Sequence, residues 1–334
     1  MRVLLTGAFG NVGTSALEAL LVGGHQVRCF DVRNKANERT ARRYQGRCEV
    51  HWGDLRSADD VAAAVRDQDV VIHLAFIIPK MSVTGVESER RPDWARAINV
   101  EGTRHLVEAM LAQPTPPELI FSSSVHVYGR TQNHQPPLTA DDPVDPLEHY
   151  SKHKIECEEM IRASGLTWAI LRFAAAMPLD IRPDTGMFDV PLENRMEYVH
   201  TRDVGLALLH AATSETIWGK TLLIGGGPRC QYHFREIAQT ILEGMGVGML
   251  PEEAFSRVQF CTDWMDTAES QRLLDYQRRD LTHYVREMQA VLGWRIPLIR
   301  RFRPLVRWWL LRQSPYYRDA HRAGKRRQVP GTVV

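Results

Sequence analysis

The sequence predicts an α/β fold: a doubly wound parallel sheet with a smaller, mixed lobe toward the C-terminus. Two observations predict it. Short apolar runs alternate with helical patterns through the first half of the chain, as in a parallel sheet covered by helices. The first run, 2–6, ends in a turn with Gly7, Gly10 and Gly13, and a helical pattern follows. Such a turn offers backbone N–H groups and a helix N-terminus to a pyrophosphate, so we expect a Rossmann-type sheet.

The other strands are expected to alternate with helices after this turn. Five further apolar or alternating segments read as strands, at 27–31, 49–52, 70–74, 119–122 and 167–172. Helical patterns lie between them, and the longest run from about 93 to 111 and from 149 to 163. Residues 130–148 are polar and rich in proline, which predicts a loop.

The regular alternation ends near residue 177, and this change suggests how the chain is divided. We expect residues 1–176 to form a nucleotide-binding Rossmann domain. Residues 177–294 are expected to form a substrate-binding lobe interleaved with the last sheet elements, and residues 295–334 a basic amphipathic tail. No internal repeat or low-complexity segment interrupts this organisation.

The composition is that of a globular protein with a sizeable core, since 44% of the 334 residues are apolar. No stretch of about 18 apolar residues occurs, and the N-terminus does not resemble a signal peptide. The five cysteines are scattered and form no CxxC pair. We therefore expect a reduced, cytoplasmic compartment and no metal site.

The charge is unevenly distributed. The net charge is +2, but residues 295–327 carry eleven Arg and Lys against one acid, which gives +10 and leaves −8 for the remainder. On a helix, one face of this tail would be apolar, formed by Leu298, Ile299, Phe302, Leu305, Val306, Trp309 and Leu310. Much of the other face would be basic, with Arg300, Arg301, Arg303 and Arg307, and Pro304 is expected to interrupt the helix.

Two interpretations of the tail stay open. A basic amphipathic helix with tryptophans suits peripheral contact with an anionic membrane surface. Alternatively, its apolar face packs on the body or on a second subunit, with the arginines meeting the acidic remainder. A homodimer is expected on this basis, and no nucleic acid partner, because no module for one is present.

The residue at the end of the second predicted strand indicates whether the cofactor is NAD or NADP. Asp31 follows Gly13 by eighteen residues, and a carboxylate there accepts hydrogen bonds from the ribose hydroxyls and repels a 2′-phosphate. NAD is therefore expected, and NADP is less favoured. Arg33, two residues further on, tempers this preference because an arginine could meet a 2′-phosphate.

A tyrosine and a lysine are placed to act together. Tyr150 and Lys154 are four residues apart and share one face of the predicted helix. A free tyrosine ionises near pH 10, and lowering its pKa by about three units costs roughly 4 kcal/mol. The ammonium and the positive nicotinamide of an oxidised cofactor would supply this. The alternative is an ordinary surface helix.

The fifth strand ends in Ser122, Ser123 and Ser124. The carboxyl ends of strands face the ligand crevice in a doubly wound sheet, so a serine there could hold a substrate oxygen beside Tyr150. A turn would also account for three serines. The three features together are much less expected by chance than any one of them.

Several segments carry a resemblance to one superfamily. Residues 6–13 (TGAFGNVG) are similar to its TGxxGxxG, 53–55 (GDL) to its adenine-contacting segment, 73–75 (HLA) to its HxA and 99–103 (NVEGT) to its NVxGT. Residues 121–129 (FSSSVHVYG) resemble FSSSxxVYG, and 198–204 (YVHTRDV) resemble its conserved tyrosine–histidine–aspartate segment. The chain thus resembles the extended short-chain dehydrogenase/reductase superfamily, in the branch of NAD-dependent epimerases and dehydratases.

The resemblance implies a reaction and its residues. A small-molecule secondary alcohol, or the matching ketone, would exchange a hydride with the nicotinamide, with Ser124, Tyr150 and Lys154 as catalytic residues. The expected cofactor contacts are Gly7, Phe9, Gly10, Asn11, Val12, Gly13, Asp31, Arg33, Asp54, Leu55, Leu74, Ala75, Phe76, Asn99, Ser122, Tyr150, Lys154, Phe173 and Ala174. A non-catalytic dinucleotide sensor is the alternative from another class, although a sensor does not need this catalytic set.

Two departures from the family pattern bear on the substrate. Dehydratases carry an acid pair where this chain has Val125 and His126, so dehydration is not expected unless His126 acts as the acid. An asparagine that helps to hold a nucleotide diphosphate corresponds to Ala175. Together with the apolar segment 76–79, this leaves room for a smaller or more apolar alcohol, as in the branch that resembles 3β-hydroxysteroid dehydrogenases.

Overall fold

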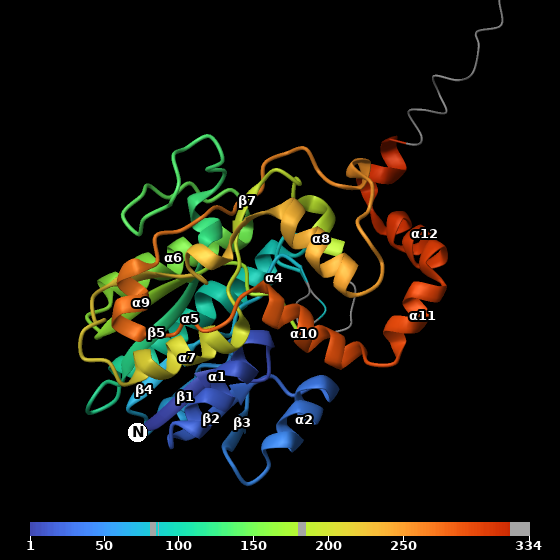
Figure 1. Cartoon of the computed structure of the whole chain (residues 1–334). Coiled ribbons are helices and arrows are strands. Elements are labelled where there is room, and N and C mark those ends of the chain that lie inside the picture. The colour runs from blue at the N-terminus through green and yellow to red at the C-terminus, as the bar shows by residue number, and fades with distance from the viewer. Residues whose placement is uncertain (81–84, 86, 180–184, 321–334) are drawn as a thin grey trace, which may run out of the picture.

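The computed structural model describes residues 1–80, 85, 87–179 and 185–320. Its centre is a parallel sheet of seven strands in the order β3-β2-β1-β4-β5-β6-β8 (Figure 1). These strands are β1 Arg2–Thr6, β2 Gln26–Asp31, β3 Glu49–Trp52, β4 Val70–His73, β5 Glu118–Ser124, β6 Trp168–Phe173 and β8 Thr221–Ile224. The strand order reverses between β1 and β4, which is where doubly wound sheets bind ligands. The predicted fold class is confirmed.

The two faces of the sheet are covered by different helices. Successive side chains of a strand point to opposite faces. Val3 and Leu5 therefore pack with the helices α1 (Asn11–Val22) and α7 (Thr201–Ala212). Leu4 packs on the other face, which is covered by α3 (Ala58–Val65), α5 (Gly102–Leu111) and α6 (His149–Ala163). A short helix, α2 (Lys35–Ala41), follows β2.

The long helix expected at 93–111 is interrupted. It consists of α4 (Pro92–Arg96), one π-helical turn (Ala97–Glu101) and α5. The side chains of Thr103 and Cys157 both donate to the carbonyl oxygen of Asn99, at 2.5 and 3.2 Å. The π-helical turn thus has one hydrogen-bond donor from another helix, Cys157 of α6. The helical spacing of apolar residues in the sequence cannot reveal such a contact.

A second apolar core lies beyond the sheet. It is built around the antiparallel pair β7 (Arg195–Glu197) and β9 (Gln231–His233) and the helices α8 (Phe234–Gly244) and α10 (Leu281–Leu292). The short helix α9 (Ala268–Leu274) instead packs near β8 and α7. Part of this region returns to the central sheet, because β8 is its last strand.

The described part of the C-terminal tail includes the helices α11 (Arg295–Arg301) and α12 (Arg303–Gln313), at one edge of the molecule (Figure 1). The helix breaks at Phe302, and Pro304 lies in the first turn of α12, so the predicted interruption is confirmed. Ile299, Val306 and Leu310 pack on the second core.

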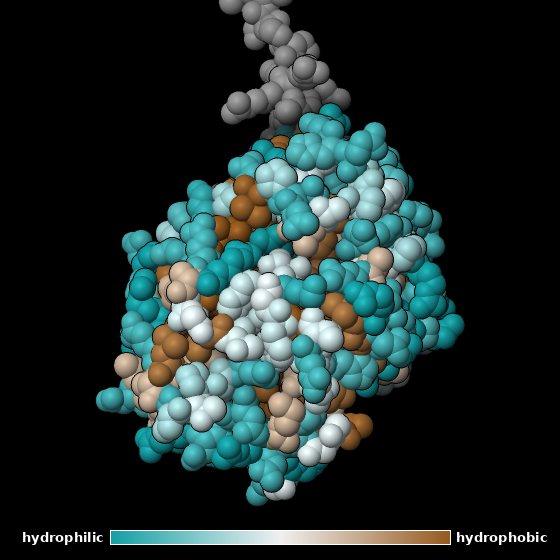
Figure 2. Space-filling view, turned by 90° about the vertical axis from the view of Figure 1, so that its left-hand side faces the viewer, coloured by the Kyte–Doolittle hydropathy of each residue, from teal (hydrophilic) through white to brown (hydrophobic). Residues whose placement is uncertain are grey.

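The rest of the expected apolar face behaves differently. Leu298, Phe302, Leu305 and Trp309 are exposed. The face of the molecule opposite α11 and α12 is mostly hydrophilic, with apolar residues in small separate groups (Figure 2). None of the helices in the described ranges has the length and apolar content that crossing a bilayer requires.

Candidate active site

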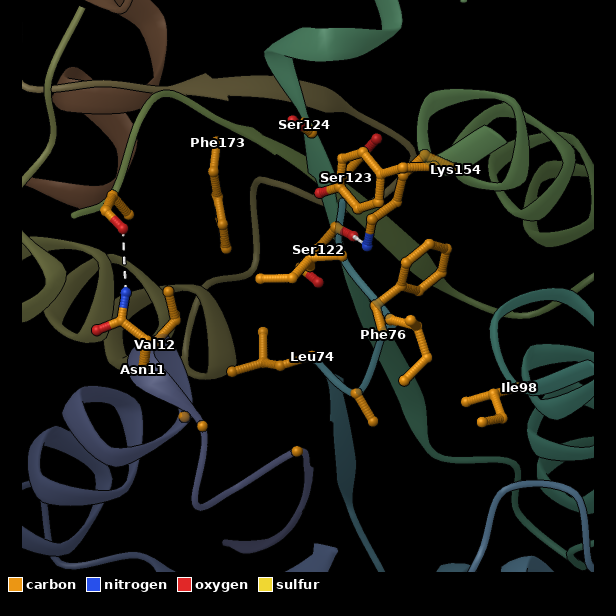
Figure 3. A pocket seen from close by; sticks show the side chains of 18 of the residues that line it. Asn11, Val12, Leu74, Phe76, Ile98, Ser122, Ser123, Ser124, Lys154 and Phe173 are labelled. Carbon is orange, nitrogen blue, oxygen red and sulfur yellow. Dashed lines mark hydrogen bonds between the residues drawn. The ribbon is translucent and has the colours of Figure 1, made fainter. Parts of the chain in front are cut away.

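A cavity of about 400 Å³ opens at the carboxyl edge of the sheet, at the reversal between β1 and β4 (Figure 3). The glycine turn after β1 forms one side of it. The ends of β2, β3, β4 and β5, one face of α6 and the residues after β6 form the others. The cavity therefore brings together segments that are far apart in the sequence.

The glycine turn has the close packing that the sequence predicts. A Cβ at Gly13 would lie 2.1 Å from the carbonyl oxygen of Gly7. Gly7 itself has φ +66°, and a Cβ there would lie 2.8 Å from the backbone N of Ala75. The first turn of α1 has no side-chain cap and no acidic residue. Its backbone N–H groups, at the cavity wall, are thus suited to an anion.

Asp31 lies at the end of β2, on the cavity wall. Its carboxylate accepts hydrogen bonds from the backbone N of Phe9 (3.0 Å), the backbone N of Val32 (2.8 Å) and Nδ2 of Asn37 (3.0 Å). Burial nevertheless raises the pKa of Asp31 to about 6. These three hydrogen bonds hold the carboxylate in a fixed orientation at the cavity wall.

Three of the expected cofactor contacts do not line the cavity. The exposed Arg33 pairs with Glu38, at 2.8 Å. The side chain of Phe9 is buried and its ring lies 5.5 Å from that of Trp52. Asn99 is also buried, where it bonds both the N–H and the carbonyl of Ile77, at 2.7 and 3.0 Å. Phe9 and Asn99 thus lie behind the cavity wall, where Phe9 packs on Trp52 and Asn99 holds the backbone of Ile77.

The remaining expected cofactor residues lie on the cavity wall. They are Gly7, Gly10, Asn11, Val12, Gly13, Asp31, Asp54, Leu55, Leu74, Ala75, Phe76, Ser122, Tyr150, Lys154, Phe173 and Ala174. Asp54 pairs with Arg56, and their hydrogen bond holds the pKa of Asp54 below its usual range.

A buried hydrogen-bond chain fixes the wall after β4. The hydroxyl of Thr6 accepts from the backbone N of Leu74 and of Ala75, at 3.2 and 3.1 Å. Its own proton therefore goes to Nδ1 of His73, 2.7 Å away. Nε2 of His73 then donates to Thr103, at 3.0 Å. Burial lowers the pKa of His73 to about 3, so this ring stays neutral and structural.

Ser124, Tyr150 and Lys154 all reach the cavity. Ser124 lowers the pKa of the Tyr150 phenol, but burial outweighs this effect and raises that pKa to about 12. Nζ of Lys154 donates to the carbonyl oxygen of Ser122, at 2.5 Å (Figure 3). It also lies 3.5 Å from the ring centroid of Phe76 and 5.8 Å from that of Tyr150.

The electrostatics differ from the sequence-based expectation. Burial lowers the pKa of Lys154 to about 7, so near neutral pH the lysine is only partly charged. Burial also dominates at Tyr150, where it outweighs the lowering effect of the Ser124 hydroxyl on the pKa, and the Lys154 ammonium is directed to the carbonyl oxygen of Ser122. In the protein alone, Tyr150 is a protonated phenol.

The cavity wall also includes residues outside the expected cofactor contacts. His126 lines the cavity, and its Nδ1 lies 2.7 Å from Oε2 of Glu148. Nδ2 of Asn11 donates to the carbonyl of Ala176, at 3.0 Å, which joins the glycine turn to the segment after β6 (Figure 3). The segments after β4 and β6, together with Ile98, contribute apolar residues to the wall: Phe76, Ile77, Ile78, Pro79, Ile98, Ala174, Ala175 and Ala176. For Ile98, the sequence offered no signal beyond a helical period.

The fold and the cavity define a nucleotide-binding protein of the Rossmann class. The model of the NAD dependent epimerase/dehydratase family matches residues 3–181, and the chain belongs to that family.

Two curated relatives differ in what they act on. The chain is 31% identical over 219 residues to UDP-glucose 4-epimerase 2 of Oryza sativa subsp. japonica, a match that covers 61% of this chain and 52% of that one. It is 37% identical over 114 residues to a 3-beta-hydroxysteroid dehydrogenase of Mycolicibacterium neoaurum, covering 32% and 28%. The chain thus spans about half the length of the first relative and less of the second.

Solved structures share the fold. The UDP-glucose-4-epimerase of Stenotrophomonas maltophila, crystallised with NAD and formylated UDP-arabinopyranose, superposes with a TM-score of 0.72 at 22% identity. That match covers 90% of this chain and 99% of the other. The UDP-glucuronic acid 4-epimerase of Bacillus cereus gives a TM-score of 0.72 at 20% identity, covering 87% and 100%.

Proposed function

We propose that this protein is an NAD-dependent oxidoreductase or epimerase that acts on a secondary alcohol or the corresponding ketone. One observation carries the proposal: Ser124, Tyr150 and Lys154 line the same cavity as the glycine turn. A dinucleotide held by the turn would have its reactive end near these three side chains. Membership of the family supports the same reading.

The residues present fit NAD. The crowded backbone at Gly7 and Gly13 and the first turn of α1 form a cradle for the pyrophosphate. Asp31 suits the ribose hydroxyls and disfavours a 2′-phosphate. The bound nicotinamide supplies the chemistry of accepting or giving a hydride.

The chain's own residues handle the proton. Tyr150 is protonated at neutral pH and lines the cavity together with Ser124, so the two hydroxyls can donate to a ketone oxygen during reduction. The reverse direction requires Tyr150 to take the hydroxyl proton, which extra positive charge beside the phenol would favour. Lys154, fixed on Ser122, is within reach to contribute part of that charge.

A nucleotide sugar is the first candidate substrate, because the longer curated match is to a UDP-glucose 4-epimerase. A specific observation favours a second candidate, a more apolar alcohol. The wall after β4 and β6 is formed by Ile77, Ile78 and Ala174–Ala176, and Ala175 offers no polar atom on its side chain. A 3-beta-hydroxysteroid dehydrogenase is among the relatives.

The experiment pairs product analysis with NADH absorbance. UDP-glucose, UDP-galactose and a 3β-hydroxysteroid are each incubated with the full-length protein and NAD. An epimerase converts one UDP-sugar into the other without net NADH, a dehydrogenase yields ketone and NADH together, and a sensor yields neither. Tyr150→Phe should abolish turnover while NAD still binds. Unchanged turnover in that variant would refute the proposed role of Tyr150.

A further inference from the structure

The exposed apolar side chains of this protein are concentrated in the C-terminal tail. Fourteen large apolar side chains in the described ranges are exposed, and seven of them lie between residues 291 and 309. These seven are Val291, Trp294, Leu298, Phe302, Leu305, Trp308 and Trp309. They include every exposed Trp and Phe of that set. Such a concentration usually marks an interaction surface.

The spacing of these residues places most of them on one side of the two helices. Trp294, Leu298, Phe302, Leu305, Trp308 and Trp309 follow one another at intervals of three or four residues, apart from the adjacent last pair, and we call them the outer stripe. The inward side has the same period. Ile299, Val306 and Leu310 pack there on the second core. The outer stripe therefore faces away from the body, at the edge shown in Figure 1.

Cations accompany the outer stripe, and the described residues form no ion pair with them. Seven arginines lie between residues 295 and 318, and none forms an ion pair within the described part of the chain. Arg303 and Arg307 instead donate to the carbonyl oxygens of Val247, Gly248 and Met249. The expectation that the arginines meet the acidic remainder is therefore not fulfilled at these positions.

Two of the exposed arginines stack on exposed tryptophans. The guanidinium of Arg295 lies 5.3 Å from the ring of Trp294, and that of Arg312 lies 4.7 Å from the ring of Trp308. Each pair is a cation–π contact that holds a guanidinium group over an indole ring. Tryptophan and arginine together suit the boundary between lipid headgroups and acyl chains.

We propose that the outer stripe and its arginines dock this protein on an anionic lipid bilayer. The helices would lie in the plane of the surface, with the apolar side chains among the acyl chains and the arginines at the phosphates. A second copy of the chain fits less well. A two-fold contact would set this cationic face against itself, and Asp319 is the one acid among residues 295–320 to pair with seven arginines. The proposal does not depend on the catalytic one.

The test is co-sedimentation of the full-length protein with vesicles. One set contains phosphatidylcholine alone, and the other contains phosphatidylcholine mixed with phosphatidylglycerol. We expect binding to the mixed vesicles, weaker binding at high salt, and little binding to phosphatidylcholine alone. No binding to the mixed vesicles at low salt, or equal binding to both kinds, would overturn the proposal.

Two variant pairs separate the contributions. Leu305→Ser with Trp308→Ser removes apolar area, and the exposed Val258→Ser is its control. Arg301→Gln with Arg312→Gln removes two cations, and we expect about 30-fold weaker binding, since each cation contributes about five-fold. Arg39→Gln with Arg43→Gln, exposed on another part of the surface, should bind as the wild type does.

Folding and assembly are measured on the same samples. The contacts of Arg303 and Arg307 to residues 247–249 are left intact by these variants, so circular dichroism and thermal unfolding should match the wild type. If only the arginine pair weakens binding, insertion of the apolar stripe is refuted. If sedimentation velocity shows that Leu305→Ser with Trp308→Ser turns a dimer into a monomer, the surface is a subunit interface and the proposal fails.

Discussion

Nδ1 of His126 lies 2.7 Å from Oε2 of Glu148, and the carboxylate of Glu148 also caps the helix that carries Tyr150 and Lys154. The cap is reciprocal, because the backbone N of Glu148 donates to the hydroxyl of Ser151, at 3.1 Å. One carboxylate thus fixes both the cavity-lining imidazole and the start of α6. Burial alone would raise the pKa of Glu148, but the hydrogen bond and charge of His126 outweigh it and lower that pKa.

Glu148→Ala should therefore destabilise the protein by about 2 kcal/mol, since it removes a helix cap and leaves His126 without its partner. The lowered pKa of Glu148 means that its contribution is present above about pH 4 and is lost as the pH falls through the folded-state pKa. Urea unfolding at several pH values measures both effects. Glu159→Ala, exposed on the same helix, is the control and should change stability by less than about 0.5 kcal/mol. Equal losses in the two variants would contradict this account.

Lys154 should make the stability of the protein rise with pH. Burial lowers its pKa to about 7, whereas an unfolded lysine titrates near pH 10.4. Between these values the unfolded chain binds the extra proton, so the free energy of unfolding increases with pH, by about 2–3 kcal/mol from pH 7 to pH 9. Lys154→Met should lack this increment in urea unfolding and should also lose turnover.

Lys152→Met is the matched control, because Lys152 is exposed on the same helix. It should keep the wild-type dependence of stability on pH and the wild-type turnover. If Lys154→Met follows the same pH dependence as the wild type, Lys154 is not the group with the lowered pKa.

The parts of this protein that the sequence predicted correctly depend on local patterns. Val70–His73 reads as a buried parallel strand because its first three residues are apolar, and it is β4. The glycine turn was predicted from the spacing of its glycines. The structure gives the reason for that spacing, since a Cβ at Gly13 has no room beside the backbone of Gly7. Tyr150 and Lys154 share a helix face through their spacing alone. Each of these inferences needs only neighbouring residues.

The parts that were wrong or missing depend on distant partners. The pKa of Tyr150 in the protein alone is set by burial, which a four-residue spacing does not report. The lowered pKa predicted with an oxidised cofactor bound stays a prediction. The turn at Ala97–Glu101 depends on Cys157, which belongs to α6. Arg303 and Arg307 find carbonyl oxygens of the segment after α8 rather than carboxylates, and net charge carries no information about such contacts.

Asp31→Asn should increase the affinity for NADPH about tenfold, by removing roughly 1.4 kcal/mol of repulsion between a carboxylate and the 2′-phosphate. The affinity for NADH should change less, because the amide oxygen of asparagine still accepts a hydrogen bond. Fluorescence titration with each nucleotide measures the two dissociation constants. Asp59→Asn, exposed in the first turn of α3, is the control and should leave both unchanged.

If Asp31→Asn leaves the discrimination intact, another group excludes the 2′-phosphate. Arg33 is the residue to examine, because its ion pair with Glu38 holds it away from the cavity wall. Glu38→Gln would release it. Added to Asp31→Asn, this change should raise NADPH affinity further if the guanidinium reaches the phosphate.

Gly10→Ala and Gly13→Ala should separate the structural role of the glycine turn from its role in binding. A Cβ at Gly13 would meet the backbone of Gly7 and Ala8, at 2.1 and 2.8 Å, and backbone atoms cannot give way without shifting the turn. We expect Gly13→Ala to lose about 3 kcal/mol of stability or more.

At Gly10 the backbone has φ −75°, and the nearest atom to a Cβ would be the carbonyl oxygen of Gly7, at 3.3 Å. Gly10→Ala should therefore fold with nearly the wild-type Tm. The added methyl group would stand where the backbone must approach the pyrophosphate, so the affinity for NAD should fall by about tenfold or more. Thermal unfolding and NAD titration of the two variants measure these effects. A Gly10→Ala protein that binds NAD as tightly as the wild type would mean that the pyrophosphate does not lie against this turn.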